Sequence, residues 1–431
     1  MTQSGLEKHD SDDSLPWKGL LLFRSLYFLD GLGGAAWGRF GIIFYNQVKQ
    51  IPADKIGLLQ GFRPIVSFFM KPFWGWLADQ IQSRKSVYLF CKLGSTVSLI
   101  TLAIPGESFL AVAISVVAMS LFPASGVLDA HTIDFLGDSH RGLYGSIRLW
   151  AAVSWGVGSV LMGFVTDYFG FWWNFVVFGV MMLFSMIFTA VLLPARSRSE
   201  QSFVERATVP RWSVLFKAIF RWQVVLWLTQ VTIMGAAMSL VESFLFVYLQ
   251  NDLHASTSLC GFTVGVTVML EIPIFFHSKF LLHRLGHDGF WMVAMVAYIV
   301  RVLGYTLLTS KTVGWVLLLE VLHGITFACS WTAAIDFAAQ IAPPEWSTLV
   351  QAVMNTCWGS LGGGLGPVLG GLVYERYGAV VLYRSAALIV GITMILHVFL
   401  YTFGLFRQDI FLQDRAGYQP LQIVSDFEMI A

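Results

Sequence analysis

Charged residues are scarce in this chain, because only 12% of its 431 residues are Asp, Glu, Lys or Arg while 56% are hydrophobic. Soluble globular domains carry about 25% charged residues. The composition therefore excludes a soluble protein and predicts a membrane protein that crosses the bilayer many times. The formal net charge of +1 gives no indication of a nucleic-acid partner, and we expect none.

Cysteine is scarce as well. The four cysteines lie in or beside apolar stretches without regular spacing, at Cys91, Cys260, Cys329 and Cys357, which suggests neither a disulfide framework nor a metal site. A Walker-type phosphate loop and an ATP-binding domain are missing, and so is a Ser/His, metal-ligand or paired-aspartate pattern on adjacent helices. We therefore expect no cofactor, no metal and no enzymatic activity, and any transport must run on a gradient.

Long apolar stretches, in contrast, are abundant. A bilayer core needs about 20 mostly apolar residues per helix, and twelve such stretches can be placed in the chain. They start near Leu20, Ile56, Ser86, Phe109, Leu143, Phe171, Trp222, Leu259, Gly289, Gly314, Leu349 and Val380. The sequence predicts an all-α membrane protein with twelve transmembrane helices.

Lysine and arginine are unevenly divided between the predicted loops. One side of the membrane holds only Lys49, Lys55, Lys311 and Arg376. The other side holds Lys8, Lys18, Arg84, Lys85, Arg141, Arg196, Arg198, Arg206, Arg211, Lys217, Arg221, Arg284, Arg407 and Arg415. Because basic loops stay in the cytoplasm, we expect both termini to be cytoplasmic, in the plasma membrane or an endomembrane. The first 18 residues lack the layout of a cleavable signal, so the first helix is expected to direct insertion.

The two halves of the chain resemble each other. The helix that starts at Trp150 aligns without a gap on the stretch from Trp358, at a constant offset of 208 residues. Identical pairs are Trp150/Trp358, Gly156/Gly364, Gly158/Gly366, Val160/Val368, Leu161/Leu369, Gly163/Gly371, Val165/Val373 and Gly170/Gly378. Glycine-rich helices can resemble each other by chance. The alternative is a duplicated six-helix unit, which predicts two pseudo-symmetric bundles with a site between them.

This duplication predicts the organisation of the chain, and we expect the protein to be a monomer. We expect a cytoplasmic N-terminal tail (1–18), a first bundle of six helices (19–193), a cytoplasmic central loop (194–221), a second bundle (222–405) and a cytoplasmic C-terminal tail (406–431).

Charged side chains inside the predicted helices point to a polar path through the bilayer. Examples are Asp30, Arg63, Asp129, Arg148, Glu271, Arg301, Glu320 and Asp336. Each is costly unless it is paired or faces a wet cavity. We interpret Arg24, Lys71, Lys92 and Arg384 as snorkelling or helix-end residues.

The segment GWLADQIQSRK, from Gly75 to Lys85, joins the second and third predicted helices. It resembles the signature loop of the major facilitator superfamily, G-x-L-A-D-x-x-G-R-[RK]-[RK], and departs from it at Gln82 and Ser83. The resemblance implies a conformational gate formed by Gly75, Asp79, Arg84 and Lys85. A second copy, KFLLHRLGHD from Lys279, keeps less of the pattern.

The fifth helix sharpens this resemblance. Gly145, Arg148, Trp155, Gly158 and Gly163 follow the pattern G-x-x-R-x(6)-W-x-x-G-x(4)-G, which resembles the lactose permease group of proton symporters. The resemblance implies that Arg148 hydrogen-bonds solute hydroxyls and that Trp155 stacks on a sugar ring, roles that suit a guanidinium fork and a broad indole. The alternatives are that Trp155 fills the core and that Arg148 is structural.

We expect Arg148 to be buried in mid-helix, where an arginine needs a carboxylate partner. Asp129 is the predicted partner, since the permease group has an acid at about this distance. We interpret Asp134 as a helix cap and His131 as a polar spacer.

Three further residues complete the predicted substrate-binding set. Asp30, with Arg39 and Arg63, is expected to complete a ring around a cavity. Trp331 and Asp336 lie in the run EVLHGITFACSWTAAIDF, which resembles eukaryotic major facilitator domain-containing proteins. Asp336 lies 207 residues after Asp129, which is close to the repeat offset of 208 residues.

The second half carries Glu242, Glu271, Arg301, Glu320 and His323. This set resembles the proton-coupling cluster of the permease group, although here the glutamate precedes the histidine. A carboxylate whose arginine partner approaches and retreats can load and release a proton, and histidine titrates near neutrality. The alternative is a set of static salt bridges between helices.

Together these features predict a secondary active transporter that works by alternating access. We expect proton-coupled symport of a small polar organic solute of the sugar or nucleoside type. A gradient-driven carrier of organic anions and a non-transporting receptor or scaffold with the same fold remain alternatives.

Overall fold

A computed structural model describes residues 17–104, 108–137, 140, 143–193, 220–341 and 347–403, without the side chains of Asp79, Lys279 and residues 347–349. The predicted tails and the predicted central loop lie almost wholly outside these residues. All regular structure in the described ranges is helical.

The described residues of the first half form eight α-helices and two short turns of other helical types. They are α1 (Trp17–Trp37), α2 (Phe40–Ile43), the π-helical turn η1 (Phe44–Val48), α3 (Ala53–Gln80), α4 (Arg84–Ile100), the 3-10 turn η2 (Thr101–Ala103), α5 (Phe109–Ser120), α6 (Ser125–Leu136), α7 (Tyr144–Phe169) and α8 (Trp172–Leu192).

The second half follows the same plan. Its elements are α11 (Trp222–Val247), the π-helical turn η4 (Tyr248–Asp252), α12 (Thr257–Phe276), α13 (Ser278–Tyr305), the 3-10 turn η5 (Val313–Trp315), α14 (Val316–Ile341), α15 (Ser347–Asn355), the π-helical segment η7 (Thr356–Gly362) and α16 (Gly363–Thr402).

Nine stretches among the described residues are long and apolar enough to cross a membrane. The last one, Val350–Thr402, has 53 residues, which is about 80 Å of helix and far more than one bilayer core. It changes direction at Gly378, where a φ of 80° breaks the helix. The sequence predicted a new helix near Val380, at this break.

Three other predicted helices differ from simple apolar rods. The predicted fourth helix is divided into α5 and α6, because Pro123 lies between them and has no N–H to donate. The helices α1 and α3 form near the predicted starts but are not among the nine, since their charged and polar residues lower the mean hydropathy.

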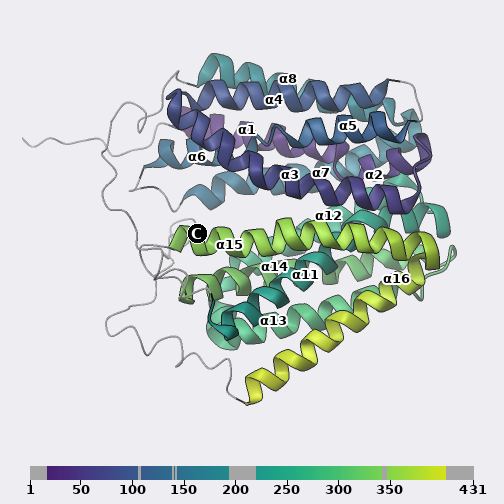
Figure 1. Ribbon diagram of the computed structural model, residues 1–431. Helices are drawn as coiled ribbons and strands as arrows, with labels where there is room; N and C mark the ends of the chain where they lie inside the picture. The colour runs from purple at the N-terminus through teal and green to yellow at the C-terminus, as the bar shows by residue number, and fades with distance from the viewer. Residues whose placement is uncertain are drawn as a thin grey trace, which may run out of the picture.

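The helices of the two halves lie on opposite sides of the molecule and run roughly along one common direction (Figure 1). The halves meet where α7 crosses α12 and where α3 crosses α16. Glycine permits both crossings, because a Cβ on Gly261 would lie 2.3 Å from the Ser159 carbonyl oxygen and one on Gly57 would lie 2.3 Å from that of Pro367.

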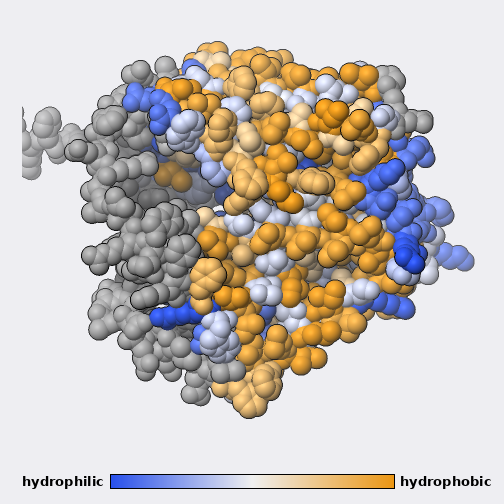
Figure 2. Space-filling model, viewed as in Figure 1, coloured by the Kyte–Doolittle hydropathy of each residue, from blue (hydrophilic) through white to orange (hydrophobic). Residues whose placement is uncertain are grey.

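The surface and the interior are both apolar. Figure 2 shows orange over most of the visible face of both halves, with blue gathered at the right-hand end. Large side chains such as Leu110, Leu307 and Met269 are exposed, as expected for a protein surrounded by hydrocarbon.

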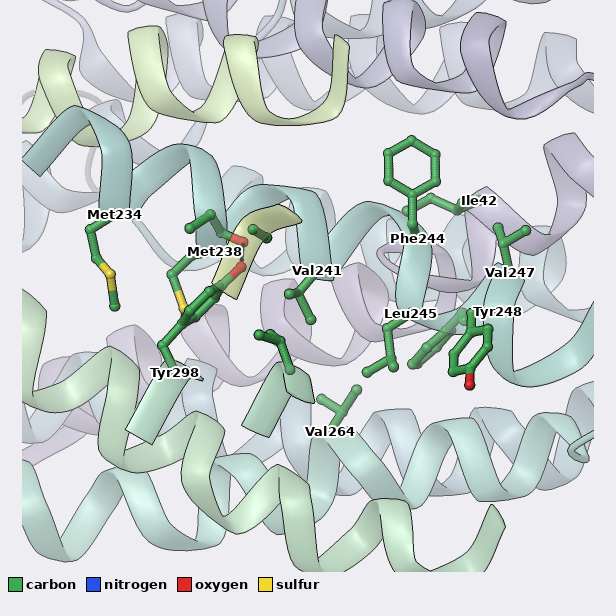
Figure 3. Packing of buried hydrophobic residues seen from close by; sticks show 14 of the residues in the cluster. Ile42, Met234, Met238, Val241, Phe244, Leu245, Val247, Tyr248, Val264 and Tyr298 are labelled. Carbon is green, nitrogen blue, oxygen red and sulfur yellow. Dashed lines mark hydrogen bonds between the residues drawn. The ribbon is translucent and has the colours of Figure 1, made fainter. Parts of the chain in front are cut away.

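The interior of the second half is densely packed around α11. Met238 and Val241 of α11 pack with Tyr298 of α13 and Val264 of α12 (Figure 3). The Tyr298 hydroxyl donates to the Ala237 carbonyl oxygen at 2.9 Å. This packing holds α13 against α11 and thereby positions the charged residues that follow on α13.

Candidate functional site

A cavity of about 720 Å³ lies between the two halves. The first half contributes α2, α3, α5, α7 and the residues that follow α1, and the second half contributes α11, α12, α14, η7 and α16. Trp155, Glu242, Glu271 and His323 are the predicted site residues that line it.

One end of the cavity is closed by hydrogen bonds between the halves. Asp167, near the end of α7, accepts from the backbone N–H groups of Thr257 and Ser258 at 2.8 and 2.7 Å. Glu375 of α16 accepts from the Ala53 N–H at 2.9 Å. Each carboxylate thus caps a helix of the opposite half, α12 in one case and α3 in the other.

The two capping carboxylates are related by the internal repeat, because Asp167 and Glu375 are 208 residues apart. Amide side chains add two contacts at the same end. Gln47 Nε2 donates to Gln250 Oε1 at 2.9 Å, and Asn251 Nδ2 donates to Asn46 Oδ1 at 2.7 Å. Sequence reasoning missed this closure, although the offset of 208 residues was available as a signal.

Three basic residues also line the cavity. Arg39 and Arg63 lie there as expected. Lys71 lies there too, although the sequence interpretation made it a snorkelling residue. That interpretation is wrong, because residues 60, 63, 64, 67 and 71 follow helical spacing and bring one polar face of α3 to the cavity. Arg39 Nη2 lies 3.6 Å from Glu242 Oε1, which is an ion pair between the halves.

A buried polar cluster lies behind the second-half wall. The side chain of Glu320 is fully buried and accepts hydrogen bonds from the Tyr305 hydroxyl and, at 3.2 Å, from Thr267 Oγ1. His323 Nδ1 lies 3.7 Å from Glu320 Oε2. Because His323 also lines the cavity, it connects the cavity with the buried carboxylate.

Arg301 is fully buried beside this cluster but forms no ion pair within 4 Å among the described residues. Its guanidinium carbon lies 5.4 Å and 6.0 Å from the ring centres of Tyr298 and Tyr305. Nη2 contacts the Met238 sulfur at 3.7 Å, while Nε and Nη1 have no hydrogen-bond partner. The structure therefore brings Arg301, Glu320 and His323 together, with a tyrosine between the arginine and the carboxylate.

The predicted Arg148 and Asp129 pair is not formed directly. Arg148 is exposed in the second turn of α7, and its Nη1 donates to the Tyr144 hydroxyl at 3.3 Å. Asp129 accepts from the Tyr27 hydroxyl at 2.6 Å. The expectations of a buried arginine and a direct ion pair are therefore wrong, and neither residue lines the cavity.

Trp155 lines the cavity and packs on α1 at the same time. A Cβ on Gly34 would lie 3.1 Å from its ring, and one on Gly38 would lie 2.3 Å from it. Gly34 of α1 and Gly38, which follows α1, thus leave room for the indole. The core-filling and ligand-facing interpretations of Trp155 are compatible.

Asp30 lies inside the first half and does not line the cavity, where we expected it. Lys92 Nζ lies 2.7 Å from Asp30 Oδ1, and the hydroxyls of Ser185 and Tyr88 donate to the two carboxylate oxygens at 2.9 Å. Lys92 is only 7% exposed. Our assignment of Lys92 to a helix end is wrong, because α4 places it opposite α1.

Asp336 also lies away from the cavity, near the ends of α13, α14 and α16. It accepts from Gln340 Nε2 at 2.6 Å and lies 3.7 Å from His287 Nδ1. Asp288 Oδ2 lies 3.2 Å from His287 Nε2, and Asp288 Oδ1 lies 3.5 Å from His397 Nε2. Sequence reasoning missed this cluster, although the second copy of the signature loop ends in the dipeptide His-Asp.

Trp331 packs on other rings instead of facing the cavity. Its ring centre lies 6.0 Å from that of Phe327 and 5.7 Å from that of Trp358. Phe327 itself lines the cavity. Within the described part of the chain, no group of three or more His, Cys, Asp or Glu side chains could hold a metal ion.

The basic residues of the signature loop join other helices of the first half. Arg84 Nη1 lies 3.4 Å from Asp134 Oδ2, so Asp134 forms an ion pair in place of the predicted helix cap. Lys85 Nζ donates to the carbonyl oxygens of Ala190 and Leu193 at 2.8 and 2.7 Å. The Asp79 side chain lies outside the described residues, and a Cβ on Gly75 would meet nothing within 4 Å.

Proteins of known sequence that are similar to this chain include a bacterial permease and a human protein. A maltose permease of Geobacillus stearothermophilus is 22% identical over 381 residues, which cover 87% of this chain and 93% of that protein. The major facilitator superfamily domain-containing protein 6-like of Homo sapiens is 27% identical over 170 residues, which cover 38% of this chain and 28% of that protein.

A solved structure and a family model agree with these similarities. The crystal structure of the nucleoside transporter NupG has a TM-score of 0.75 to this chain at 17% identity, and the match covers 90% of this chain and 99% of that one. At this identity the likeness establishes a shared fold. The sequence model of the MFS_1 like family matches residues 41–385. Because this match spans most of its length, the chain belongs to the MFS_1 like family, within the major facilitator superfamily that its signature loop predicted.

Proposed function

We propose that this chain is a secondary transporter that works by alternating access and couples a proton to a small polar organic solute of the sugar or nucleoside type. The observation that carries the proposal is the cavity between the halves, which has charged walls and is closed at one end. Its volume of about 720 Å³ suits a small organic molecule. The similarity to a maltose permease and to a nucleoside transporter supports the solute type.

The proposal includes twelve membrane crossings in two six-helix bundles, 19–193 and 222–405. In this arrangement α5 and α6 form one crossing together, α1 and α3 form one each, and α16 divides at Gly378 into two. The termini and the loop 194–221 are cytoplasmic, the lipid bilayer surrounds the helices, and the protein is a monomer. The closed end of the cavity then faces away from the cytoplasm.

Alternating access requires that the closed end opens. Asp167 and Glu375 are suited to hold it, because each carboxylate binds backbone N–H groups at a helix N-terminus of the other half. Such charge-assisted bonds stabilise closure without fixing it permanently. Loss of both carboxylates should therefore shift the population toward the state that is open at this end.

The double variant Asp167→Asn/Glu375→Gln is expected to lower the ratio of closed to open protein at this end by about tenfold. The reason is the free energy that hydrogen bonds to charged groups usually contribute. Closure can be measured as the rate of oxidative cross-linking between cysteines introduced at Gln47 and Gln250, which contact each other at 2.9 Å. Asp252→Asn is the matched control, because Asp252 accepts from Tyr374 within one half. An unchanged cross-linking rate in the double variant would contradict the role of Asp167 and Glu375 in closure.

The buried cluster supports proton coupling. Glu320 is sealed from solvent, while His323 reaches both the cavity and Glu320. Two nitrogens of the Arg301 guanidinium have no hydrogen-bond partner, and Tyr305 lies between Arg301 and the Glu320 carboxylate. A movement of Arg301 toward Glu320 would favour the ionised carboxylate, and its retreat would favour the protonated one. In this mechanism a proton enters from the cavity through His323.

Uptake into vesicles tests this function. Purified protein in lipid vesicles is given maltose or uridine with an imposed proton gradient, acidic outside or acidic inside. We expect solute to accumulate on the side to which protons flow, and accumulation to vanish when a protonophore removes the gradient. Accumulation that ignores the proton gradient would defeat the coupling, and absence of any uptake would favour a receptor or scaffold.

A further inference from the structure

The charged side chains on the cavity wall are separated by sign. The first half contributes three bases, Arg39, Arg63 and Lys71, while the second half contributes two carboxylates, Glu242 and Glu271. Among the described lining residues, no carboxylate comes from the first half and no lysine or arginine comes from the second. The cavity is therefore polarised from one half to the other.

Only one of these bases is matched by an acid. Arg39 forms the ion pair with Glu242 at 3.6 Å. Arg63 Nη1 donates to the neutral Gln60 Oε1 at 2.9 Å. In the described part of the chain, no carboxylate lies within 4 Å of Arg63 or Lys71. Cations that face a wet cavity can remain in the membrane without an acidic partner, and their charge attracts an anionic ligand.

Arg63 and Lys71 differ in what they offer such a ligand. They are eight residues apart on one face of α3, which places them about 12 Å apart along the helix axis. The Arg63 fork can bind a carboxylate with two parallel hydrogen bonds. Lys71 is farther from the closed end and attracts an anion as a point charge along the way.

Apolar side chains line the cavity together with these bases. Trp155 of α7 and Phe327 of α14 present aromatic surfaces from the two halves, and Met119 and Val268 line the cavity as well. A ligand with one carboxylate and a compact organic body would therefore contact both kinds of surface.

We propose that the solute of this transporter is a small organic monoanion whose carboxylate binds the Arg63 guanidinium, with Lys71 guiding it and Trp155 and Phe327 contacting its body. This inference rests on the transport and proton coupling of the proposed function, and it replaces a neutral solute with one that carries a carboxylate. Three bases against two ionised carboxylates leave one net positive charge in the cavity. A single negative charge on the solute balances this charge while both carboxylates are ionised.

The same arrangement couples the anion to a proton. Glu271 of the second half lines the cavity, and the charged groups that act on it are Arg39, Glu242 and Glu320. The buried Glu320 belongs to the second half, so a proton on it removes a negative charge from the half opposite the bases that bind the anion. Each ligand therefore favours binding of the other, which is the reciprocal coupling that symport needs.

Ligand-dependent thermal stability of the purified full-length chain tests the substrate class. The probes are glucuronate against glucose, and 3-phenylpropionate against 3-phenylpropan-1-ol, so that each pair differs in the carboxylate. A ligand that binds the folded state raises the apparent melting temperature. We expect the carboxylates to bind at least about tenfold more tightly than their neutral partners.

Variants of the bases locate the effect. Arg63→Gln is expected to weaken carboxylate binding by about tenfold to a hundredfold, and Lys71→Gln to weaken it less. Lys55→Gln on the same helix is the matched control, because Lys55 does not line the cavity. Should Arg63→Gln fail to fold, Arg63→Lys keeps the charge without the fork and should still lose part of the affinity.

Three results would overturn the inference. They are stabilisation by neutral and anionic partners alike, a carboxylate preference that survives Arg63→Gln, and stabilisation by neither carboxylate. Proton-driven uptake of maltose or uridine without carboxylate binding would leave the proposed function standing and refute this inference alone. Carboxylate binding that depends on Arg63, with uptake insensitive to the proton gradient, would support the inference and refute the coupling.

Discussion

Glu320→Gln is expected to abolish proton-driven accumulation while exchange of solute across the membrane continues. With one proton per solute, a gradient of one pH unit sustains about tenfold accumulation, since one unit is worth 1.36 kcal/mol. Glutamine keeps the size of the side chain and its acceptor for Tyr305, but it cannot release a proton. The accumulation ratio should therefore fall to about one.

The measurement compares two assays on the same vesicles. Net accumulation is followed under an imposed pH gradient, and exchange is followed with labelled solute on one side and unlabelled solute on the other, without a gradient. Asp252→Asn serves as the control, because it changes a carboxylate outside the buried cluster. If Glu320→Gln retains gradient-driven accumulation, the buried carboxylate is not the coupling site.

Lys92→Met is expected to destabilise the folded protein by about 3–5 kcal/mol, the usual effect of leaving one member of a buried ion pair alone. The Asp30 side chain is only 18% exposed and would keep the hydroxyls of Tyr88 and Ser185 as partners, but no cation. Two hydrogen bonds do not replace the ammonium group at 2.7 Å. The melting temperature in detergent should fall strongly.

The double variant Asp30→Asn/Lys92→Met separates the ion pair from packing. Removal of both charges should cost less than removal of Lys92 alone, because no uncompensated charge remains. Thermal unfolding of the wild type, the two single variants and the double variant gives the coupling free energy. Strictly additive effects would show that the pair contributes nothing beyond the separate side chains.

Local features of the sequence were sufficient for most of the fold. Most helices begin close to the predicted positions, since apolar stretches of the right length identify them regardless of what surrounds them. The exception is α13, which begins at Ser278 instead of near Gly289 and breaks at Gly286, where φ is 67°. Gly378 was included in the repeat alignment and is the position where α16 breaks. Pro123, which divides the predicted fourth helix, was visible in the sequence but was not used.

Only part of the candidate site could be predicted from local features of the sequence. Trp155 of the predicted substrate-binding set lines the cavity, and so do Glu242, Glu271 and His323 of the predicted proton-coupling cluster. Asp30 and Lys92 proved to be partners inside one half, and Lys71 proved to face the cavity. Helical spacing on α3 could have identified Lys71, but no local pattern links Asp30 on α1 with Lys92 on α4.

The sequence by itself determined that this protein is a polytopic helical membrane protein of the major facilitator superfamily, because composition, hydropathy and the signature loop are properties of short segments. Only the tertiary structure decided which intramembrane charges meet the cavity and which neutralise each other. It also revealed the closure by Asp167 and Glu375, whose partners lie in the opposite half. The physical reason is that the free energy of a charge in a membrane depends on the groups around it, and those groups come from other helices.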